Sequence, residues 1–403
     1  EKTMKLHLGD LYWDETRNNT DYLELTEDFD IDVLVIGGGM SGALISHELG
    51  LRGFETAVID KKIPGYGSSD GNTGIIQYHS DDSLPEMIEN FGEKQAVDFY
   101  RLSIEAMKRL GEIAESLPED TGYKKTHSLL LAAKEENTSE LRENNRILNH
   151  YGFPSEYIDQ ETLEKNYNIH AYGALKTGSD AELNPFKMVQ ALHKENLKRG
   201  VKVYKNAPAD KITEKENGFV ITSGSFTIYA KSLILAMGYA KDVYPNIEEA
   251  LERNTTYSFV TEKIHEKLWG KEEMIWDDED PYVYFRKLED HRVIAGGRDE
   301  KGEKLSSLEN IEKETNKIYE TICGYYPDFK AKIAHRWQSV FGESKDGLPF
   351  IGRDEENKDK YYAFGYGGNG TCYSVMASMI IADFLEEKEH PLAYTTKYPR
   401  EKN

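Results

Sequence analysis

The sequence predicts an α/β fold that begins with a Rossmann-like βαβ unit, and three observations support this. A β-branched apolar run, Ile31 to Ile36, leads into the glycine cluster Gly37-Gly38-Gly39-Met40-Ser41-Gly42 and then into an apolar helical stretch. A second short strand, Thr56 to Ile59, ends at Asp60. Hairpin-like strands between Thr255 and Gly296 then predict a second, antiparallel part of the fold.

The glycine cluster has the G-x-G-x-x-G spacing of a dinucleotide site. Gly37 permits the tight turn, Gly39 lets the backbone approach a pyrophosphate, and Gly42 lets the helix pack on the strand. The positive helix N-terminus meets the negative charge of the ligand, and an acid at Asp60 suits a ribose hydroxyl. We therefore expect a dinucleotide site that includes Gly37, Gly39, Met40, Ser41, Gly42, Asp60 and Lys61.

The rest of the chain alternates between helical and strand patterns. Periodicity predicts helices over 84–117, 139–151, 185–199, 307–322 and 371–386. Strands are predicted over 128–133, 201–204, 219–222, 226–229, 232–235, 255–261, 282–287, 292–296 and 361–364. Residues 64–82 are rich in glycine and serine and are predicted to form a loop close to a ligand.

Composition narrows the class of protein. The chain has 403 residues, a formal net charge of −22 and two cysteines, Cys323 and Cys372. The length suggests two or three domains or one interleaved pair, and the charge argues against nucleic-acid and anionic-membrane partners. There is no metal-type cysteine spacing and no membrane-length apolar run. The polar residues 1–30 do not have the pattern of a signal peptide, so we expect a cytoplasmic protein without a metal.

Three further glycine-rich segments, 65–74, 236–238 and 365–370, distinguish FAD from NAD. A nicotinamide dehydrogenase usually needs one glycine fingerprint, whereas FAD extends along several loops that let the backbone approach it. The last loop precedes a helix whose positive end would face the flavin pyrimidine oxygens. The FAD contacts expected from these loops are Gly67, Ser68, Ser69, Asn72, Thr73, Gly74, Ile75, Ala236, Gly238, Gly367, Gly368, Asn369, Gly370 and Thr371.

Together these motifs resemble the D-amino-acid oxidase superfamily of flavoproteins, which includes glycine oxidase, sarcosine oxidase and gamma-glutamylputrescine oxidase. Residues 67–76 are similar to the flavin-facing loop of sarcosine oxidase, and 233–238 to the family's Ala-Thr-Gly strand end, with Met237 in place of Thr. Residues 337–352 with 365–371 resemble the closing segment under the flavin ring, which adds Gly342 to the expected contacts. Ala209 falls where relatives contact the adenine.

The resemblance implies an architecture. A Rossmann-like FAD-binding domain (1–88, 180–240 and 338–403) is interleaved with an α+β substrate domain (89–179 and 241–337) built on a mixed or antiparallel sheet. Ser339 stands where sarcosine oxidase has its flavin-linking cysteine. We therefore expect FAD to be held noncovalently.

The departures from the family concern the substrate. Phe341 stands where glycine oxidase has an arginine that grips the substrate carboxylate, and Gly368 stands at another family arginine. A buried carboxylate without a paired arginine is costly. Arg286 and Arg298 are candidates to replace it, although a structural ion pair is the favoured interpretation for Arg298.

Three candidate catalytic residues adjoin the predicted flavin loops. Tyr78 and His79 follow the flavin-facing loop, and His79 would titrate near neutral pH if unperturbed; the alternative is a partly exposed loop histidine. Glu343, in the closing segment, is placed either to pair a substrate ammonium or at the surface.

Three more candidates share one predicted strand. Alternation puts Tyr282, Tyr284 and Arg286 on one face, where the tyrosines would line an aromatic wall over the flavin or pack in the domain core.

These features predict an FAD-dependent oxidoreductase that oxidises a C–N bond of a small amine or amino acid by hydride transfer to flavin N5. Oxygen or another acceptor would reoxidise the flavin. An FAD-dependent 2-hydroxy-acid dehydrogenase, taking a hydroxy-acid substrate, is one alternative. A non-catalytic flavin-binding regulatory protein is another, because fold alone does not separate these functions.

Overall fold

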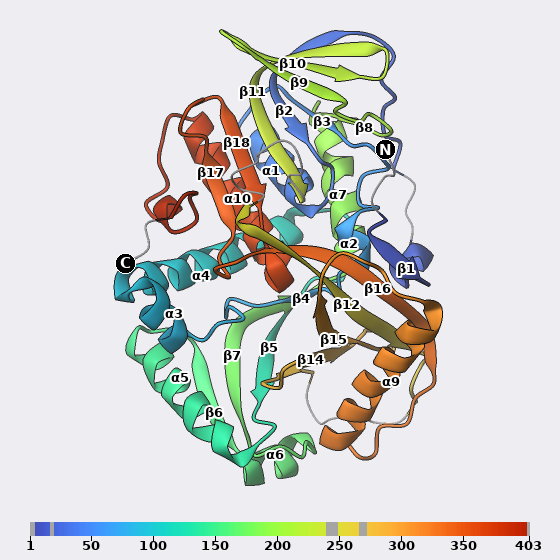
Figure 1. The fold of residues 1–403 in the computed structure, drawn as a ribbon, viewed down its shortest axis with the longest axis vertical. Helices are drawn as coiled ribbons and strands as arrows, with labels where there is room; N and C mark the ends of the chain where they lie inside the picture. Colours follow the sequence, from blue (N-terminus) through green and yellow to red (C-terminus); the bar gives the residue numbers. More distant parts are fainter. Residues whose placement is uncertain (1–4, 17–19, 239–248, 266–271, 401–403) are drawn as a thin grey trace.

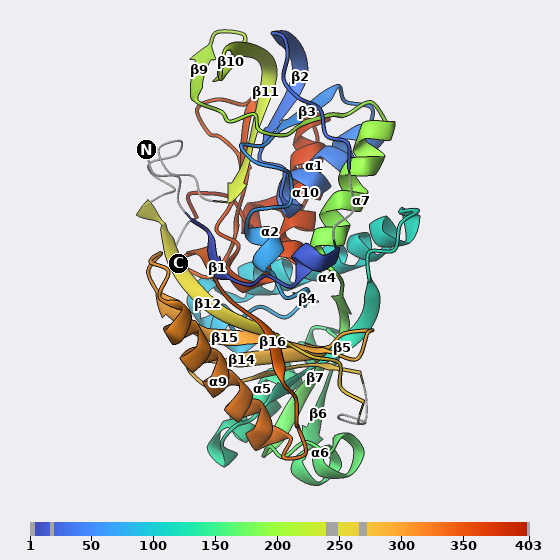
Figure 2. The same ribbon diagram turned by 90° about the vertical axis from the view of Figure 1, so that its right-hand side faces the viewer.

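The computed structural model describes residues 5–16, 20–238, 249–265 and 272–400, and they are built around two sheets (Figure 1). An eight-stranded sheet occupies the upper half of Figure 1 and a ten-stranded sheet the lower half. Helix α9 lies along the outer side of the ten-stranded sheet, and α1, α7 and α10 lie beside the eight-stranded sheet (Figure 2). Within the described ranges, no helix combines the length and the apolar character needed to cross a membrane.

The eight-stranded sheet has a parallel core in the order β18-β11-β2-β3-β8. Strand β17 pairs antiparallel with β18, and β10 and β9 extend antiparallel from β11. The strands are β2 (Phe29–Ile36), β3 (Thr56–Ile59), β8 (Lys202–Tyr204), β9 (Lys211–Lys215), β10 (Gly218–Ser223), β11 (Phe226–Gly238), β17 (Phe350–Arg353) and β18 (Lys360–Phe364). The parallel core confirms the predicted Rossmann-like unit.

The ten-stranded sheet is mixed, in the order β1-β16-β12-β15-β14-β13-β5-β7-β4, with β6 paired to β7. All its pairs are antiparallel except β13 with β5. The strands are β1 (His7–Gly9), β4 (Ile75–Ile76), β5 (Lys124–Leu131), β6 (Ser155–Asp159), β7 (Gly173–Glu182), β12 (Leu251–Thr261), β13 (Met274–Asp277), β14 (Val283–Lys287), β15 (Val293–Lys301) and β16 (Ile333–Ser344). The mixed sheet that the sequence predicts is therefore confirmed.

Helices cover both sheets and bury their apolar faces against them. Leu44, Ile45 and Leu49 of α1 are fully buried, because α1 packs against both α7 and α10. Ile311 and Ile318 of α9 pack in one core with strand residues of the larger sheet. The α-helices are α1 (Met40–Leu51), α2 (Ser68–Gly71), α3 (Leu84–Phe91), α4 (Glu93–Ser116), α5 (Thr138–His150), α6 (Gln160–Tyr167), α7 (Pro185–Lys198), α9 (Leu308–Tyr325) and α10 (Gly370–Leu385). The 3-10 turns are η1 (Trp13–Thr16), η2 (Glu135–Asn137), η3 (Gly367–Asn369) and η4 (Ala393–Thr395).

Several predicted boundaries are wrong for identifiable reasons. The single helix predicted over 84–117 is two helices, because Gly92 adopts φ +82° between α3 and α4. The strands predicted over 226–229 and 232–235 are one strand, β11. The loop predicted over 64–82 contains α2 and β4.

Two junctions of the proposed domain division can be compared with the positions of the strands. Strand β16 lies wholly in the ten-stranded sheet, so the 337/338 junction falls inside a strand. The 240/241 junction lies outside the described residues. The division remains a proposal.

Candidate functional site

The glycine fingerprint brings β2, α1 and β11 into close contact. Gly37 adopts φ +107°, and a Cβ there would lie 2.3 Å from the Ala236 carbonyl oxygen. A Cβ on Gly42 would lie 1.7 Å from the Gly37 carbonyl oxygen. At Gly39 the only neighbour of such a Cβ is Ser69 Oγ, at 3.3 Å. The first two positions thus require glycine for packing, whereas Gly39 opens towards a ligand, as a pyrophosphate cradle requires.

Asp60 organises the turn that follows the fingerprint. Its Oδ2 accepts a hydrogen bond from the Gly38 amide and its Oδ1 one from the Lys62 amide, both at 2.8 Å. Its removal from water raises the pKa of the carboxyl despite these bonds. The Ala207 amide donates to the Asp60 carbonyl (2.7 Å), which brings the segment containing Ala209 alongside. Lys61 is exposed.

The predicted flavin-facing loop lies over the start of α1. The Met40 amide donates to Ser69 Oγ (3.0 Å), and Asn72 Oδ1 accepts from the Gly74 amide (2.7 Å). Trp13 donates its indole N–H to the Asn72 carbonyl (2.6 Å), so the N-terminal leader closes against the loop. Gly67 and Ser68 begin α2, and Thr73 precedes Ile75 of β4.

The closing glycine loop is tied to both earlier segments. Ser41 Oγ lies 2.5 Å from the Tyr366 hydroxyl, and the Asn369 side chain donates to the Gln77 carbonyl (2.6 Å). Gly370 and Thr371 open α10. No described residue lies within 4 Å of the position that a Cβ on Gly238, at the end of β11, would take. Gly342 lies on β16.

The residues present fit FAD. Backbone amides at the start of α1, the open face of Gly39 and an acid at the end of β3 suit a dinucleotide. The flavin-facing loop and the closing glycine loop both bond to the start of α1, and the closing loop leads into α10. When bound there, FAD would be held by the cofactor residues predicted from sequence, and it would supply a two-electron acceptor.

Tyr78 and His79 lie in the core rather than at a reactive position. Tyr78 is fully buried and donates to the Pro154 carbonyl (2.9 Å). His79 is buried with its Nε2 2.9 Å from Asn144 Nδ2, and burial lowers its pKa to about 4. The condition for titration near neutral pH, an unperturbed environment, is not met at His79, and the alternative of a partly exposed loop histidine is wrong because the side chain is buried.

Arg286 and Arg298 are both engaged by the protein. Arg286 is buried and donates to the carbonyls of Thr73 (3.1 Å) and Leu183 (2.8 Å), with Glu182 Oε2 3.6 Å from its Nη1. Arg298 forms an ion pair with Glu314 at 2.7 Å. Both guanidinium groups are thus engaged by protein groups in this structure.

Tyr282 and Tyr284 lie together, as alternation predicts. Their ring centroids are 5.9 Å apart, and both side chains are half-buried, whereas Val283 and Phe285 are buried in the core against α9. Burial raises the pKa of Tyr284 to about 12 and also raises that of Tyr282 well above its usual value.

Three carboxylates gather beside these tyrosines and the closing loop. A Cβ on Gly368 would lie 3.6 Å from both Asp81 Oδ2 and the Tyr282 hydroxyl. A Cβ on Gly367 would lie 3.6 Å from Glu343 Oε2. Asp299 is the third carboxylate, and its charge acts on Asp81, Glu343 and both tyrosines. We call Asp81, Asp299 and Glu343 the acidic cluster.

The acidic cluster is held in an environment that disfavours charge. Removal from water, followed by the charges of Asp299 and Glu343, raises the pKa of Asp81 to about 7. Burial raises the pKa of Asp299 to about 6 and also raises that of Glu343. Asp81 is nevertheless exposed, so a molecule from solution can reach it.

Sequence reasoning missed Asp81 and Asp299. Asp81 follows the flavin-facing loop by a few residues, and this position in the sequence could have identified it as a candidate site residue. Asp299 comes from β15, and only the sheet order β15-β14 places it beside Tyr282.

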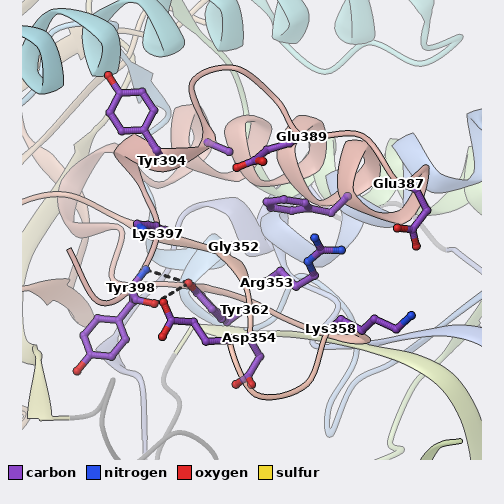
Figure 3. Close-up of a pocket in the computed structure, with 13 residues that line it drawn as sticks. Gly352, Arg353, Asp354, Lys358, Tyr362, Glu387, Glu389, Tyr394, Lys397 and Tyr398 are labelled. Carbon is purple, nitrogen blue, oxygen red and sulfur yellow. Dashed lines mark hydrogen bonds between the residues drawn. The ribbon is translucent and has the colours of Figure 1, made fainter. Parts of the chain in front are cut away.

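A separate surface hollow of about 460 Å³ lies near the C-terminus (Figure 3). Arg353, Lys358 and Lys397 alternate there with acidic side chains, and the Tyr362 hydroxyl accepts from the Tyr398 amide (2.9 Å). None of the predicted site residues lines it. This hollow is therefore distinct from the cofactor and acidic-cluster residues.

Comparisons with known proteins agree with this geometry. A family model described as FAD-dependent oxidoreductase (DAO) matches residues 32–384. Glycine oxidase of Geobacillus kaustophilus is 22% identical over 89% of this chain and 93% of its own length. Gamma-glutamylputrescine oxidoreductase of Escherichia coli is 24% identical over 98% of this chain and 94% of its own length.

Solved structures show the same fold. The Geobacillus glycine oxidase superposes with a TM-score of 0.79 at 20% identity, covering 92% of this chain and 99% of that one. L-proline dehydrogenase from P. horikoshii gives a TM-score of 0.78 at 19% identity, covering 93% and 98%. With the family match spanning most of the sequence, this chain belongs to the DAO family of FAD-dependent oxidoreductases.

Proposed function

We propose that this enzyme oxidises the C–N bond of a small amine, with oxygen or another acceptor taking the electrons afterwards. One observation carries the proposal. Where the family resemblance puts an arginine, this chain has Gly368, and a side chain starting there would have its Cβ 3.6 Å from both the Asp81 carboxylate and the Tyr282 hydroxyl. Anionic groups at this position complement a substrate ammonium and repel a substrate carboxylate.

The surroundings support the same choice. The basic candidates Arg286 and Arg298 are bound by Glu182 and Glu314. Among the described residues, no ion pair neutralises a member of the acidic cluster. The tyrosine rings add faces that attract a cation. An α-amino acid would add its own carboxylate to the three of the acidic cluster, with no guanidinium to pair with it.

The named relatives span both substrate classes. One is a glycine oxidase and another a gamma-glutamylputrescine oxidoreductase. Their names leave the choice between amino acid and amine open, and the acidic cluster favours the amine.

The protein's own contribution to the reaction is binding and orientation. The start of α1, with Ser69 beside it, would hold the pyrophosphate of FAD. The acidic cluster and the tyrosines would hold and orient the amine, and FAD would supply the hydride acceptor when bound. Ser339 replaces the linking cysteine of sarcosine oxidase, so acid precipitation should release FAD into solution. Flavin that stays on the precipitated chain would contradict noncovalent binding.

The test is anaerobic stopped-flow flavin reduction with matched pairs such as putrescine and ornithine, or ethylamine and alanine. Each amine should reduce the flavin faster than its amino acid. Faster reduction by the amino acids would overturn the amine preference. Reduction only by hydroxy acids would support a 2-hydroxy-acid dehydrogenase, and no reduction by any compound would support a non-catalytic flavoprotein.

A charge-inversion variant sharpens the test. A Cβ at Gly368 has no neighbour closer than 3.6 Å and the residue is not left-handed, so a side chain can be placed there. Gly368→Arg should slow reduction by amines by about tenfold or more, equivalent to about 1.4 kcal/mol. Gly368→Ala is the matched control and should keep the wild-type preference.

A further inference from the structure

Asp81 differs from the rest of the acidic cluster in having no protein partner. Within the described ranges it makes no hydrogen bond and no ion pair, and it keeps accessible surface. Glu343, by contrast, accepts a hydrogen bond from Asn254, and Asp299 faces the hydroxyls of Tyr282 and Thr256. Asp81 is therefore the carboxylate of the cluster that is free to interact with a ligand.

Two buried oxygen acceptors at the acidic cluster have no hydrogen-bond partner among the described residues. Asn254 is 6% exposed, and its amide nitrogen is committed to Glu343, so its Oδ1 is left without a partner. Asp299 Oδ1 is also a buried acceptor without a partner. Buried acceptors normally find donors. These two acceptors would be satisfied by a ligand with N–H donors, and this preference adds to the one that the negative charge gives.

The groups that act on Asp81 come from several elements, and none is a cation. Asp299 lies on β15, Glu343 on β16 and Asp82 next to it in the chain, and all three disfavour its charged form. Tyr282 precedes β14, and Tyr373 of α10 also interacts with it. An ammonium group would be the first positive charge in this environment.

We infer that Asp81 accepts the proton of the substrate ammonium group, so that the neutral amine is the species held for oxidation. In this step one N–H bond of R–CH₂–NH₃⁺ breaks and one O–H bond forms on Asp81. The ion pair becomes a neutral amine and a carboxylic acid, and no electrons are transferred. The amine keeps the lone pair that stabilises the cation left when its carbon later loses a hydride. The inference rests on the proposed amine oxidation.

The energetics of the site suit this role. A base works best when its pKa lies near the working pH, and that of Asp81 is raised to about 7. Neutralising the ammonium and the carboxylate together also relieves the cost of holding charge away from water.

The first experiment measures flavin reduction by an accepted amine in the holoenzyme from about pH 6 to about pH 10. In the wild type the rate constant should rise through about pH 7 as Asp81 loses its proton. Asp81→Asn should be slower by about 100-fold at neutral pH. Its deficit should shrink towards pH 10, where solution itself supplies neutral amine. Asp82→Asn is the matched control, because Asp82 faces Gly347. It should keep the wild-type rate above neutral pH, with the rise moved slightly to lower pH because one negative charge near Asp81 is lost.

A second readout does not depend on turnover. tert-Butylamine has no hydrogen on the carbon next to nitrogen and so is not oxidised by hydride loss. Its binding to the holoenzyme, measured by calorimetry near pH 6 in two buffers of different ionisation enthalpy, should release about one proton in the wild type. Asp81→Asn should release none, and Asp81→Glu should restore both proton release and the rise in rate.

The outcomes separate the two proposals. An Asp81→Asn deficit that is equal at every pH, or unchanged proton release, would overturn the role of Asp81 while leaving amine oxidation standing. A wild-type enzyme that no amine reduces would overturn the proposed function itself.

Discussion

The hydroxyl oxygens of Ser41 and Tyr366 lie 2.5 Å apart, although 325 residues separate them in the chain. Ser41 belongs to the first turn of α1, which carries the dinucleotide fingerprint, and Tyr366 to the glycine loop that precedes α10. This contact holds the first turn of α1 and the glycine loop before α10 together at the expected cofactor site.

Removing this contact should weaken FAD binding modestly. Ser41→Ala and Tyr366→Phe should each cost about 0.5–1.5 kcal/mol, the usual worth of one neutral hydrogen bond. The double variant should cost little more than the larger single effect, because both substitutions remove the same bond. FAD titration of apoprotein measures this. Tyr362→Phe loses a hydroxyl that bonds to the Tyr398 backbone instead, and it should leave FAD affinity unchanged.

Gly39→Val should abolish FAD binding. Its Cβ already approaches Ser69 Oγ at 3.3 Å, and the additional methyl groups would occupy the space beside the pyrophosphate. Asp60→Ala should weaken binding by about 1.5–3 kcal/mol, because it frees the Gly38 and Lys62 amides. Flavin absorbance per protein after purification reports both. Gly324→Val, at an open position on α9, is the control, and equal flavin content in Gly39→Val would show that the site is misplaced.

Arg286→Ala should destabilise the fold without changing substrate preference. The guanidinium holds two backbone carbonyls and faces the buried Glu182. Leaving that carboxylate unpaired should cost about 3–5 kcal/mol of unfolding free energy. Denaturant unfolding should show a smaller loss for Arg298→Ala, whose partner also contacts Lys317. If Arg286→Ala removed an advantage of amino acids over amines, Arg286 would be a carboxylate clamp after all.

Stability should fall as the pH rises from about 5 to about 7, in part because of Asp180. Burial raises the pKa of Asp180 to about 7, above its ordinary value, so the folded state binds this proton more tightly than the unfolded chain. The stabilisation is present at low pH and is lost through that window, at up to about 1.4 kcal/mol per pH unit. Asp180→Asn should flatten the dependence in denaturant titrations. The exposed Asp328→Asn is the control and should keep the wild-type slope.

Local chemistry made the cofactor half of the molecule predictable. Gly37, Gly39, Gly42 and Asp60 lie within one βαβ unit, where spacing along the chain determines spacing in the fold. The helix beginning at Pro185 was equally clear, because Asn184 caps it. The 84–117 error shows the limit, since a glycine within an apolar periodic segment can either stay in a helix or end it, and the local pattern does not decide between them.

The substrate half depended on long-range pairing. His79 was a candidate because it follows the flavin-facing loop and an unperturbed histidine titrates near neutral pH, yet it is buried and lies beside Asn144 of α5. Arg286 was a candidate carboxylate clamp, but in the structure it faces Glu182 of β7. The sequence patterns did not predict β7, so this partner could not be foreseen. Asp299 reaches the site only through the sheet order, which no local pattern specifies.

Strand β16 bears on how the molecule unfolds. Near its middle, Trp337 packs beneath the flavin-facing loop and donates to the Gly71 carbonyl (3.3 Å). Near its end, Glu343 bridges to Tyr366 in the closing loop. One continuous strand is thus shared by the larger sheet and two segments of the cofactor site. We therefore expect the two halves to melt in a single cooperative transition, and a protease cut within β16 to disable both halves together.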